Sequence, residues 1–239
     1  MRAGSILGNV VVRKEDPTLL RGDGTFVGNL DLPEVLSGVF VRAPMAHALI
    51  SAIDVSEAAT MPGVVAVLTA SDLDIGAVPG FMSSDPVMAR TPLAVDRVRF
   101  VGEPVALVVA RTETEATDAA EAVVVDYDAL PAVADPVAAV GPDAPLIIPG
   151  STSNIALSVT GPRADDFFAD ASVVVKGRFV NPRMAAMPME PNAFAAEPDP
   201  DVPGGLKLWA ATQMPHGLRS AMAPLLGLDP ELVRVIAPH

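Results

Sequence analysis

The sequence contains no cysteine among its 239 residues. This absence excludes disulfides, zinc–cysteine sites, cysteine nucleophiles and iron–sulfur clusters held by this chain. The three histidines, His47, His216 and His239, are scattered along the chain and do not form a metal-ligand motif. We therefore expect no metal site built from the side chains of this protein.

Aromatic residues and long apolar runs are also scarce. Aromatics make up 4% of the residues although 50% are hydrophobic, so the core must consist mainly of Ala, Val, Leu, Ile and Met. No stretch approaches the roughly 20 apolar residues of a membrane span. Residues 1–16 lack the apolar run of a signal peptide. These features predict a cytoplasmic protein without a membrane span.

Positive charge is sparse as well. The chain has 16 Lys and Arg residues against 29 Asp and Glu, which gives a formal net charge of -13 at pH 7. The basic residues form no cluster dense enough to reverse this sign locally, and phosphate backbones would be repelled. We therefore expect no nucleic-acid partner. The acidity is typical of a solubility feature, with a charged docking face as the alternative.

Local patterns divide the chain into four parts. Residues 1–30 are charged and turn-rich, with no helical or strand period, and predict an extended arm. Residues 31–140 have regular apolar runs and predict a first domain. Residues 141–165, rich in Ala, Pro, Gly and Ser, predict a linker before a second domain at residues 166–239.

The first domain is predicted to be mainly strands. Apolar runs separated by proline and glycine predict strands at residues 39–41, 49–53, 64–68 and 104–110, with a short helix at 56–60. Thr112 and Glu115 have the spacing of a capping box, which predicts a helix before a further strand at 123–125. The right-handed crossover rule predicts that the two strands flanking this helix are parallel.

The second domain repeats this mixture of strands and helix. Strands are predicted at residues 173–179, 193–197, 206–211 and 232–236. Between the last two, a helix should begin near Pro215 and end near Gly227, because proline suits the first turn and glycine the C-terminal cap. Its apolar stripe would be Leu218, Met222 and Leu225.

Four segments, taken together and in order, resemble a known family. They are RKEDP at residues 13–17 with Leu20, Gly22, Gly24 and Phe26; FVRAPMAHA at 40–48 with PGV at 62–64 and VLT at 67–69; VRFVGEPVA at 98–106 with VDY at 125–127 and LP at 130–131; and MEP at 189–191 with ATQ at 211–213, His216, Arg219, LGL at 226–228 and VRV at 233–235. These segments are similar to the molybdopterin-binding large subunit of molybdenum hydroxylases of the xanthine dehydrogenase, aldehyde oxidase and carbon monoxide dehydrogenase type. The likeness spans nearly the whole chain.

The resemblance implies a mixed α+β and α/β fold, with a hammerhead domain followed by the beginning of the first molybdenum-cofactor-binding domain. It implies oxidative hydroxylation of a small substrate, such as carbon monoxide, an aldehyde or an N-heterocycle, with water as the oxygen source. The implied cofactor is molybdenum–molybdopterin cytosine dinucleotide. The implied partners are the remainder of the large subunit, an iron–sulfur small subunit with [2Fe-2S] clusters, and an FAD-binding medium subunit. A cysteine-free chain fits this division of labour.

Individual residues have candidate roles, of which the first follows from the resemblance and the others from the local sequence. Gln213 corresponds to the family's glutamine beside the metal, where its amide can donate a hydrogen bond; the alternative is a helix-capping amide. Glu190 lies in an apolar setting and is interpreted as a structural hydrogen-bond acceptor. The sequence around Glu103 is expected to set the entry of a buried strand. Methionines near residues 82–88 and 184–189 are interpreted as packing residues, with a substrate funnel as the alternative.

The family pattern continues beyond this sequence. A glycine-rich cofactor-binding loop would follow at about His239, and the family's catalytic glutamate belongs to a later segment. We therefore expect no catalytic residue in this chain, no activity from the chain alone, and exposed apolar surface from about residue 170 onward. The alternative hypothesis is a cofactor-free remnant that acts as a binding or assembly module.

Overall fold

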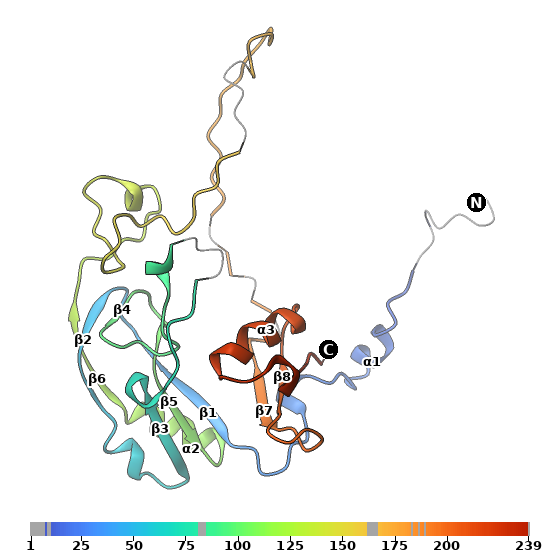
Figure 1. The fold of residues 1–239 in the computed structure, drawn as a ribbon. Helices are drawn as coiled ribbons and strands as arrows, with labels where there is room; N and C mark the ends of the chain where they lie inside the picture. The colour runs from blue at the N-terminus through green and yellow to red at the C-terminus, as the bar shows by residue number, and fades with distance from the viewer. Residues whose placement is uncertain are drawn as a thin grey trace. The chain divides into compact units, whose positions relative to one another are not determined.

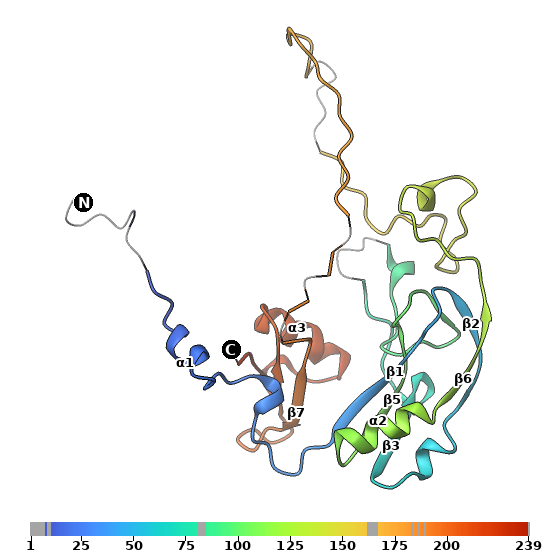
Figure 2. The same ribbon diagram turned by 180° about the vertical axis from the view of Figure 1, so that it is seen from behind.

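The computed structural model describes residues 8, 11–80, 85–161, 167–182, 184–185, 187–188 and 190–238. The chain forms two compact units. One unit comprises residues Pro33–Phe179, and the other combines Met1–Leu32 with Val180–His239. The N-terminal segment therefore belongs to the same unit as the C-terminal part of the chain (Figures 1 and 2).

The first sheet of the 33–179 unit has the strand order β1-β5-β3. Its strands are β1 (Ser37–Arg42), β3 (Val64–Thr69) and β5 (Pro104–Ala110). The central strand β5 pairs antiparallel with both neighbours, and Val108 lies opposite Val39 on one side and Val67 on the other. Its nearly continuous apolar sequence follows from this position, because both of its faces are covered.

The second sheet of this unit has the order β4-β2-β6. It consists of β2 (Ala48–Asp54), β4 (Arg97–Val98) and β6 (Val124–Ala129), and both pairings are antiparallel. The predicted parallel pairing across the crossover helix is therefore wrong, since β5 and β6 lie in different sheets. The handedness rule applies only to two strands of one sheet, and local sequence does not show which sheet a strand joins.

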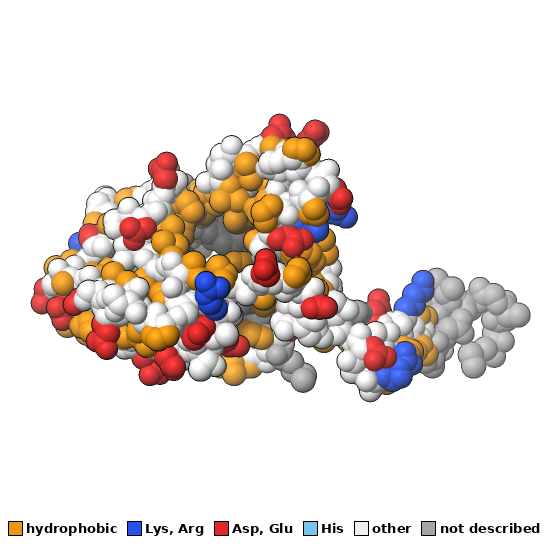
Figure 3. All heavy atoms as spheres, turned by 90° about the horizontal axis from the view of Figure 1, so that it is seen from below, with side chains coloured by type: hydrophobic (Ala, Val, Ile, Leu, Met, Phe, Trp, Pro, Cys, Tyr) orange, Lys and Arg blue, Asp and Glu red, His pale blue; other side chains and the backbone are white. Residues whose placement is uncertain are grey.

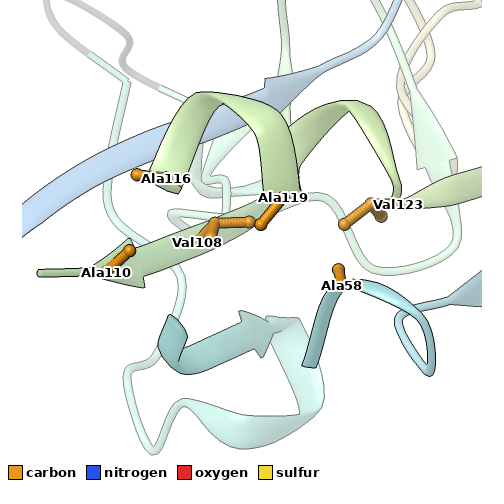
Figure 4. Packing of buried hydrophobic residues seen from close by; sticks show 6 residues of the cluster. All are labelled: Ala58, Val108, Ala110, Ala116, Ala119 and Val123. Carbon is orange, nitrogen blue, oxygen red and sulfur yellow. The ribbon is translucent and has the colours of Figure 1, made fainter. Parts of the chain in front are cut away.

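Helix α2 (Glu113–Glu121) packs on the first sheet. It begins as the capping box predicts: the Thr112 hydroxyl accepts a hydrogen bond from the Glu115 backbone N–H at 3.2 Å. Small side chains let the helix approach the strand closely, and Ala119 faces Val108 in Figure 4. The buried cluster around this contact consists of Ala58, Val108, Ala110, Ala116, Ala119 and Val123.

Short 3-10 helices occupy several connections of this unit: η2 (Ala58–Thr60), η3 (Ala70–Asp72), η4 (Pro86–Met88) and η5 (Ala138–Val140). The η2 turn stands where a short helix was expected at residues 56–60. Asn154 organises the segment after β6: its side-chain oxygen accepts from the Ile147 N–H, and its amide nitrogen donates to the Ala139 and Pro145 carbonyls, each at 3.0 Å.

One predicted strand of this unit is not formed. Residues 173–179 contain no regular secondary structure, although their sequence favours a strand. A strand requires a neighbouring backbone for its hydrogen bonds, and sequence propensity cannot supply that neighbour. The prediction of exposed apolar surface is confirmed, because Val173, Val175 and Phe179 are 77%, 87% and 92% exposed.

The other unit contains a three-stranded sheet of order β7-β8-β9 in its described part. Strands β7 (Phe194–Pro198) and β8 (Leu206–Ala210) are antiparallel, whereas β8 and β9 (Val233–Ile236) are parallel. Helix α3 (Pro215–Leu225) connects β8 to β9 and contacts β9, ahead of a 3-10 turn, η6 (Pro230–Leu232).

The predicted stripe of α3 is confirmed as its partly buried face. Leu218, Met222 and Leu225 are all partly buried, and Ala223 beside them is fully buried. Leu208, Ala210 and Val233 are the buried apolar residues in the strands of the sheet.

The N-terminal segment is not wholly extended, and this part of the sequence prediction is wrong. Residues Asp16–Leu20 form a short helix, α1, with Pro17 in its first turn, and Val27–Asn29 form the 3-10 turn η1. Pro17 favours a first helical turn because its φ is fixed at a helical value. The prediction of an extended arm relied on the absence of a helical hydrophobic period and did not use this signal. No helix within the described residues is long and apolar enough to cross a membrane.

Candidate cofactor-binding edge

Gln213 lies between the end of β8 and the start of α3 and is exposed. Strands β8 and β9 are parallel and end together, with Trp209 opposite Ile236. Gln213 therefore follows a strand at the carboxyl edge of a parallel pair. Open sheets with parallel strands bind ligands at this edge, because the loops there converge on helix N-termini.

The turn that holds Gln213 is built by its neighbours. The Ala211 N–H donates to the Ala193 carbonyl at 2.9 Å, which continues the β7–β8 ladder beyond the strand. The Thr212 hydroxyl accepts from the Met214 N–H at 3.1 Å, and the Met214 carbonyl accepts from the Leu218 N–H at 2.9 Å. These bonds fix the backbone on both sides of Gln213 and leave its amide out of the turn.

The helix-capping alternative for Gln213 is not formed. Met214 occupies the N-cap position of α3, and no side chain caps that end of the helix. Within the part of the chain that the structure describes, the Gln213 amide makes no hydrogen bond. Sequence reasoning did not single out Thr212, although a threonine two residues before a helix-starting backbone N–H is a recognisable local turn signal.

The chemistry of this edge suits an acceptor-rich ligand. The Gln213 amide nitrogen is a neutral donor, and the start of α3 carries the positive end of the helix dipole. Pro215 has no backbone N–H, so the first donors of the helix come from His216 and Gly217. A ligand with oxo, hydroxyl or phosphate oxygens would match these donors without a metal-ligating side chain.

Beside α3 lies a cleft of about 340 Å³ in the same unit. His216 and Arg219 line it, but Gln213 does not. The Arg219 Nε donates to the Pro230 carbonyl at 2.5 Å, and the His216 carbonyl accepts from the Ser220 hydroxyl at 3.0 Å. Arg219 thus ties the helix to the loop that follows it, and His216 contributes its backbone carbonyl to the helix.

Three further residues, Glu190, Glu103 and His47, make structural contacts. Glu190 accepts a hydrogen bond from the Val27 N–H at 3.3 Å, which confirms it as a structural acceptor. Glu103 is buried and accepts from the Arg99 N–H at 2.5 Å, at the turn into β5. His47 is buried, and its Nδ1 lies 2.7 Å from the Pro131 carbonyl.

Two further expectations concern metals and methionines. No group of three or more His, Cys, Asp or Glu side chains that could hold a metal occurs among the described residues. Met88 is buried in its unit, whereas Met184 and Met187 are exposed. Met82 and Met189 lie outside the described residues.

On the visible face of Figure 3, acidic side chains clearly outnumber basic ones.

Two family models match the chain in the order of its domains. The model of the aldehyde oxidase and xanthine dehydrogenase a/b hammerhead domain matches residues 21–131, and that of the molybdopterin cofactor-binding domain matches residues 148–239. Gln213 lies in the second match. The fold and these models define a large-subunit chain of the molybdenum hydroxylase class.

Individual relatives agree with this class. The chain is 37% identical to the carbon monoxide dehydrogenase large chain of Afipia carboxidovorans, over 95% of this chain and 30% of that protein. It is 35% identical to the nicotine 6-hydroxylase large subunit of Paenarthrobacter nicotinovorans, over 98% of this chain and 29% of that protein.

Solved structures show the same likeness. The reconstituted CO dehydrogenase from Oligotropha carboxidovorans matches with a TM-score of 0.82 and 36% identity, covering 97% of this chain and 30% of that chain. The aldehyde oxidoreductase from Desulfovibrio gigas matches with a TM-score of 0.79 and 32% identity, covering 95% and 26%. The protein belongs to the aldehyde oxidase and xanthine dehydrogenase family and corresponds to the N-terminal part of its molybdopterin-binding large subunit. It spans about 30% of the length of the curated relatives above.

Proposed function

We propose that this chain contributes to a molybdopterin-dependent oxidoreductase that hydroxylates a small substrate with oxygen from water. The observation that carries this proposal is the position of Gln213: an exposed amide, free of the local turn, at the carboxyl edge of β8 and β9 and inside the cofactor-domain match. Carbon monoxide, an aldehyde or an N-heterocycle are the substrate classes, and the matched relatives include a carbon monoxide dehydrogenase and a nicotine hydroxylase.

The residues of this edge would bind the cofactor rather than perform the reaction. The Gln213 amide would donate a hydrogen bond to an oxygen of the molybdenum–molybdopterin cytosine dinucleotide, and the first N–H groups of α3 would favour its negative charge. Thr212 would keep the amide in place by holding the Met214 N–H. When bound, the cofactor supplies the oxidising centre that removes two electrons from the substrate. In this proposed function, the chain itself would supply no catalytic acid or base.

The partners follow from what the chain lacks. With no cysteine it cannot hold [2Fe-2S] clusters, so an iron–sulfur small subunit and an FAD-binding medium subunit would carry the electrons onward. The remainder of the large subunit would complete the cofactor site, and the assembly would be cytoplasmic. Relatives named as a large chain and as a subunit gamma support a multi-subunit arrangement.

The test is to isolate the native assembly through an affinity tag on this chain and measure its molybdenum by mass spectrometry. We expect near-stoichiometric molybdenum, and cytidine monophosphate after acid hydrolysis of the pterin dinucleotide. Gln213→Ala and Gln213→Glu should each lower turnover by about 100-fold or more, as the loss of one preorganised donor does elsewhere. Asn181→Ala, which removes another exposed amide of the same unit, should leave turnover unchanged. An assembly without molybdenum would instead support the cofactor-free binding module.

A further inference from the structure

Two arginines lie beside the turn that leads into β5 without pairing with an acidic side chain. The Arg42 Nη1 donates a hydrogen bond to the Gly102 carbonyl at 2.9 Å, and the Arg90 Cζ lies 5.3 Å from the centre of the Phe100 ring. Neither arginine forms an ion pair within the part of the chain that the structure describes. This is unexpected in a chain with 29 acidic and 16 basic residues. The two positions are distant in the sequence, so only the fold brings them to one turn.

The backbone holds both arginines in place, although both residues are exposed. Arg42 ends β1 where the register with β5 shifts between Val41 and Arg42, and such an irregularity redirects the side chain that follows it. Arg90 exchanges two backbone hydrogen bonds with Val78, at 2.7 and 2.9 Å. The Arg42 Cζ also lies 5.2 Å from the centre of the Phe40 ring. An arginine stacked on an aromatic ring keeps the donors at the edge of its guanidinium available for a carboxylate.

The same turn exposes apolar side chains on a firmly held backbone. Phe100 and Val101 are 41% and 65% exposed. The Glu103 N–H donates to the Phe100 carbonyl at 3.2 Å, and the buried Glu103 carboxylate accepts from the Arg99 N–H at 2.5 Å. The exposed tip is therefore preorganised, and binding there would order little additional backbone.

Arginine and aromatic side chains together are typical of the centres of protein interfaces. The acidic groups close to this turn are already engaged, because Arg97 pairs with Asp96 at 3.3 Å and Arg99 pairs with Glu103 at 3.2 Å. The formal net charge of -13 means that most of the surface repels an acidic ligand. The turn is thus a place where two guanidiniums and an apolar tip can accept one.

We propose that Arg42, Arg90, Phe100 and Val101 form a docking surface for a short acidic segment of a partner polypeptide. Carboxylates of that segment pair with the two guanidiniums, and an apolar side chain beside them packs on the exposed tip. A short acidic segment is favoured over nucleic acid, because a long polyanion would also meet the acidic remainder of the surface. The proposal goes beyond the cofactor role of Gln213 and does not depend on it.

Zero-length cross-linking of the native assembly identifies the occupant. Arg42→Lys and Arg90→Lys keep the positive charge and introduce amines that a carbodiimide couples to carboxylates in contact with them. We expect both amines to couple to Asp or Glu of one short segment of another polypeptide. Arg111→Lys, at an exposed arginine of the same unit, should give no cross-link to another polypeptide. Cross-links confined to the same polypeptide, cross-links to a second copy of it, or no cross-links would each overturn the proposal.

Charge reversal tests the electrostatic part of the docking surface. Arg42→Glu combined with Arg90→Glu should reduce the cross-linked partner recovered per copy of this chain at least about tenfold, because like charges then face each other. Arg111→Glu should leave that recovery unchanged. Equal recovery from the two proteins would overturn the proposal. Their melting temperatures should agree with that of the unmodified protein, and if the double variant does not fold, the two lysine variants still decide.

A matched pair of valines tests the apolar tip. Val101→Ser should reduce recovery of the partner about fivefold or more, because it removes apolar surface that docking would bury. Val65→Ser, at another exposed valine of the same unit with 53% exposure, should not reduce it. Equal recovery would overturn the assignment of Val101 to the docking surface. None of these measurements depends on the molybdenum content of the assembly, so failure of docking and failure of the proposed function are distinguished.

Discussion

The Glu190 carboxylate accepts a hydrogen bond at 3.3 Å from the backbone N–H of Val27, which lies 163 residues earlier in the sequence. Val27 is buried and begins the 3-10 turn η1. The bond therefore ties the N-terminal segment to the unit formed by the C-terminal part of the chain. Glu190 has a structural task here, which accounts for a carboxylate in an apolar stretch of sequence.

Substitution of Glu190 tests this tie. Glu190→Ala should weaken the attachment of the N-terminal segment by about 1 kcal/mol, since it leaves the Val27 N–H without its acceptor. Glu190→Gln keeps a side-chain oxygen and should cost less. Limited proteolysis between residues 11 and 24 should accelerate by about fivefold in the alanine variant. Identical digestion of the alanine and glutamine variants would show that the hydrogen bond does not hold the segment.

The buried ion pair at the entry of β5 should contribute more to stability. Glu103 accepts from the Arg99 backbone N–H, and its other oxygen lies 3.2 Å from the Arg99 guanidinium. Glu103→Ala would leave that guanidinium largely buried without its partner and should lower the free energy of unfolding by about 3 kcal/mol. Asp23→Ala, which breaks the exposed pair with Arg21, should cost under about 1 kcal/mol. Urea denaturation of both variants provides the comparison, and equal losses would contradict it.

A side chain at position 63 should destabilise the protein. Its φ of +79° lies in the left-handed region, and an added Cβ would collide with the Glu115 carboxyl group. Gly63→Ala should therefore destabilise the 33–179 unit by about 1–3 kcal/mol. Gly76→Ala is the matched control, because its Cβ would meet nothing within 4 Å and its φ is not in that region. Thermal melts of the two variants should separate clearly; superimposable melts would contradict the steric argument.

Asp72 should make the folding stability of the protein dependent on pH at acidic values. Hydrogen bonds from the Thr69 backbone N–H at 2.7 Å and from its hydroxyl at 2.8 Å hold the pKa of the Asp72 carboxyl below its ordinary range. The pKa of Asp72 is lower in the folded protein than in the unfolded chain. Ionised Asp72 therefore stabilises the fold fully above its unfolded-state pKa, and this stabilisation is lost as the pH falls through its folded-state pKa.

Thr69→Val removes the hydroxyl donor and should raise the Asp72 pKa toward its ordinary value. An NMR titration of the carboxyl would measure the change. Thr60→Val, whose hydroxyl donates to the Glu57 carbonyl instead, should leave the Asp72 titration unchanged. An unaltered titration in Thr69→Val would mean that the backbone bond alone lowers the pKa.

Local sequence determined most of the individual elements. The buried strand β5, the capping box at Thr112 and the bounds of α3 depend on short-range periodicity, turn residues and caps, and the structure confirms them. The prediction that Gln213 follows a strand and precedes a helix is confirmed for the same reason. These features require only contacts between neighbours in the chain.

Only the tertiary structure decided how distant segments pair. The separation of β5 and β6 into two sheets, and the contact between Glu190 and Val27, join residues far apart in sequence. Strand propensity at 173–179 did not produce a strand, because a ladder depends on a second backbone. Hydrogen-bond partners of this kind are selected by packing of the whole molecule, and local composition carries little information about them.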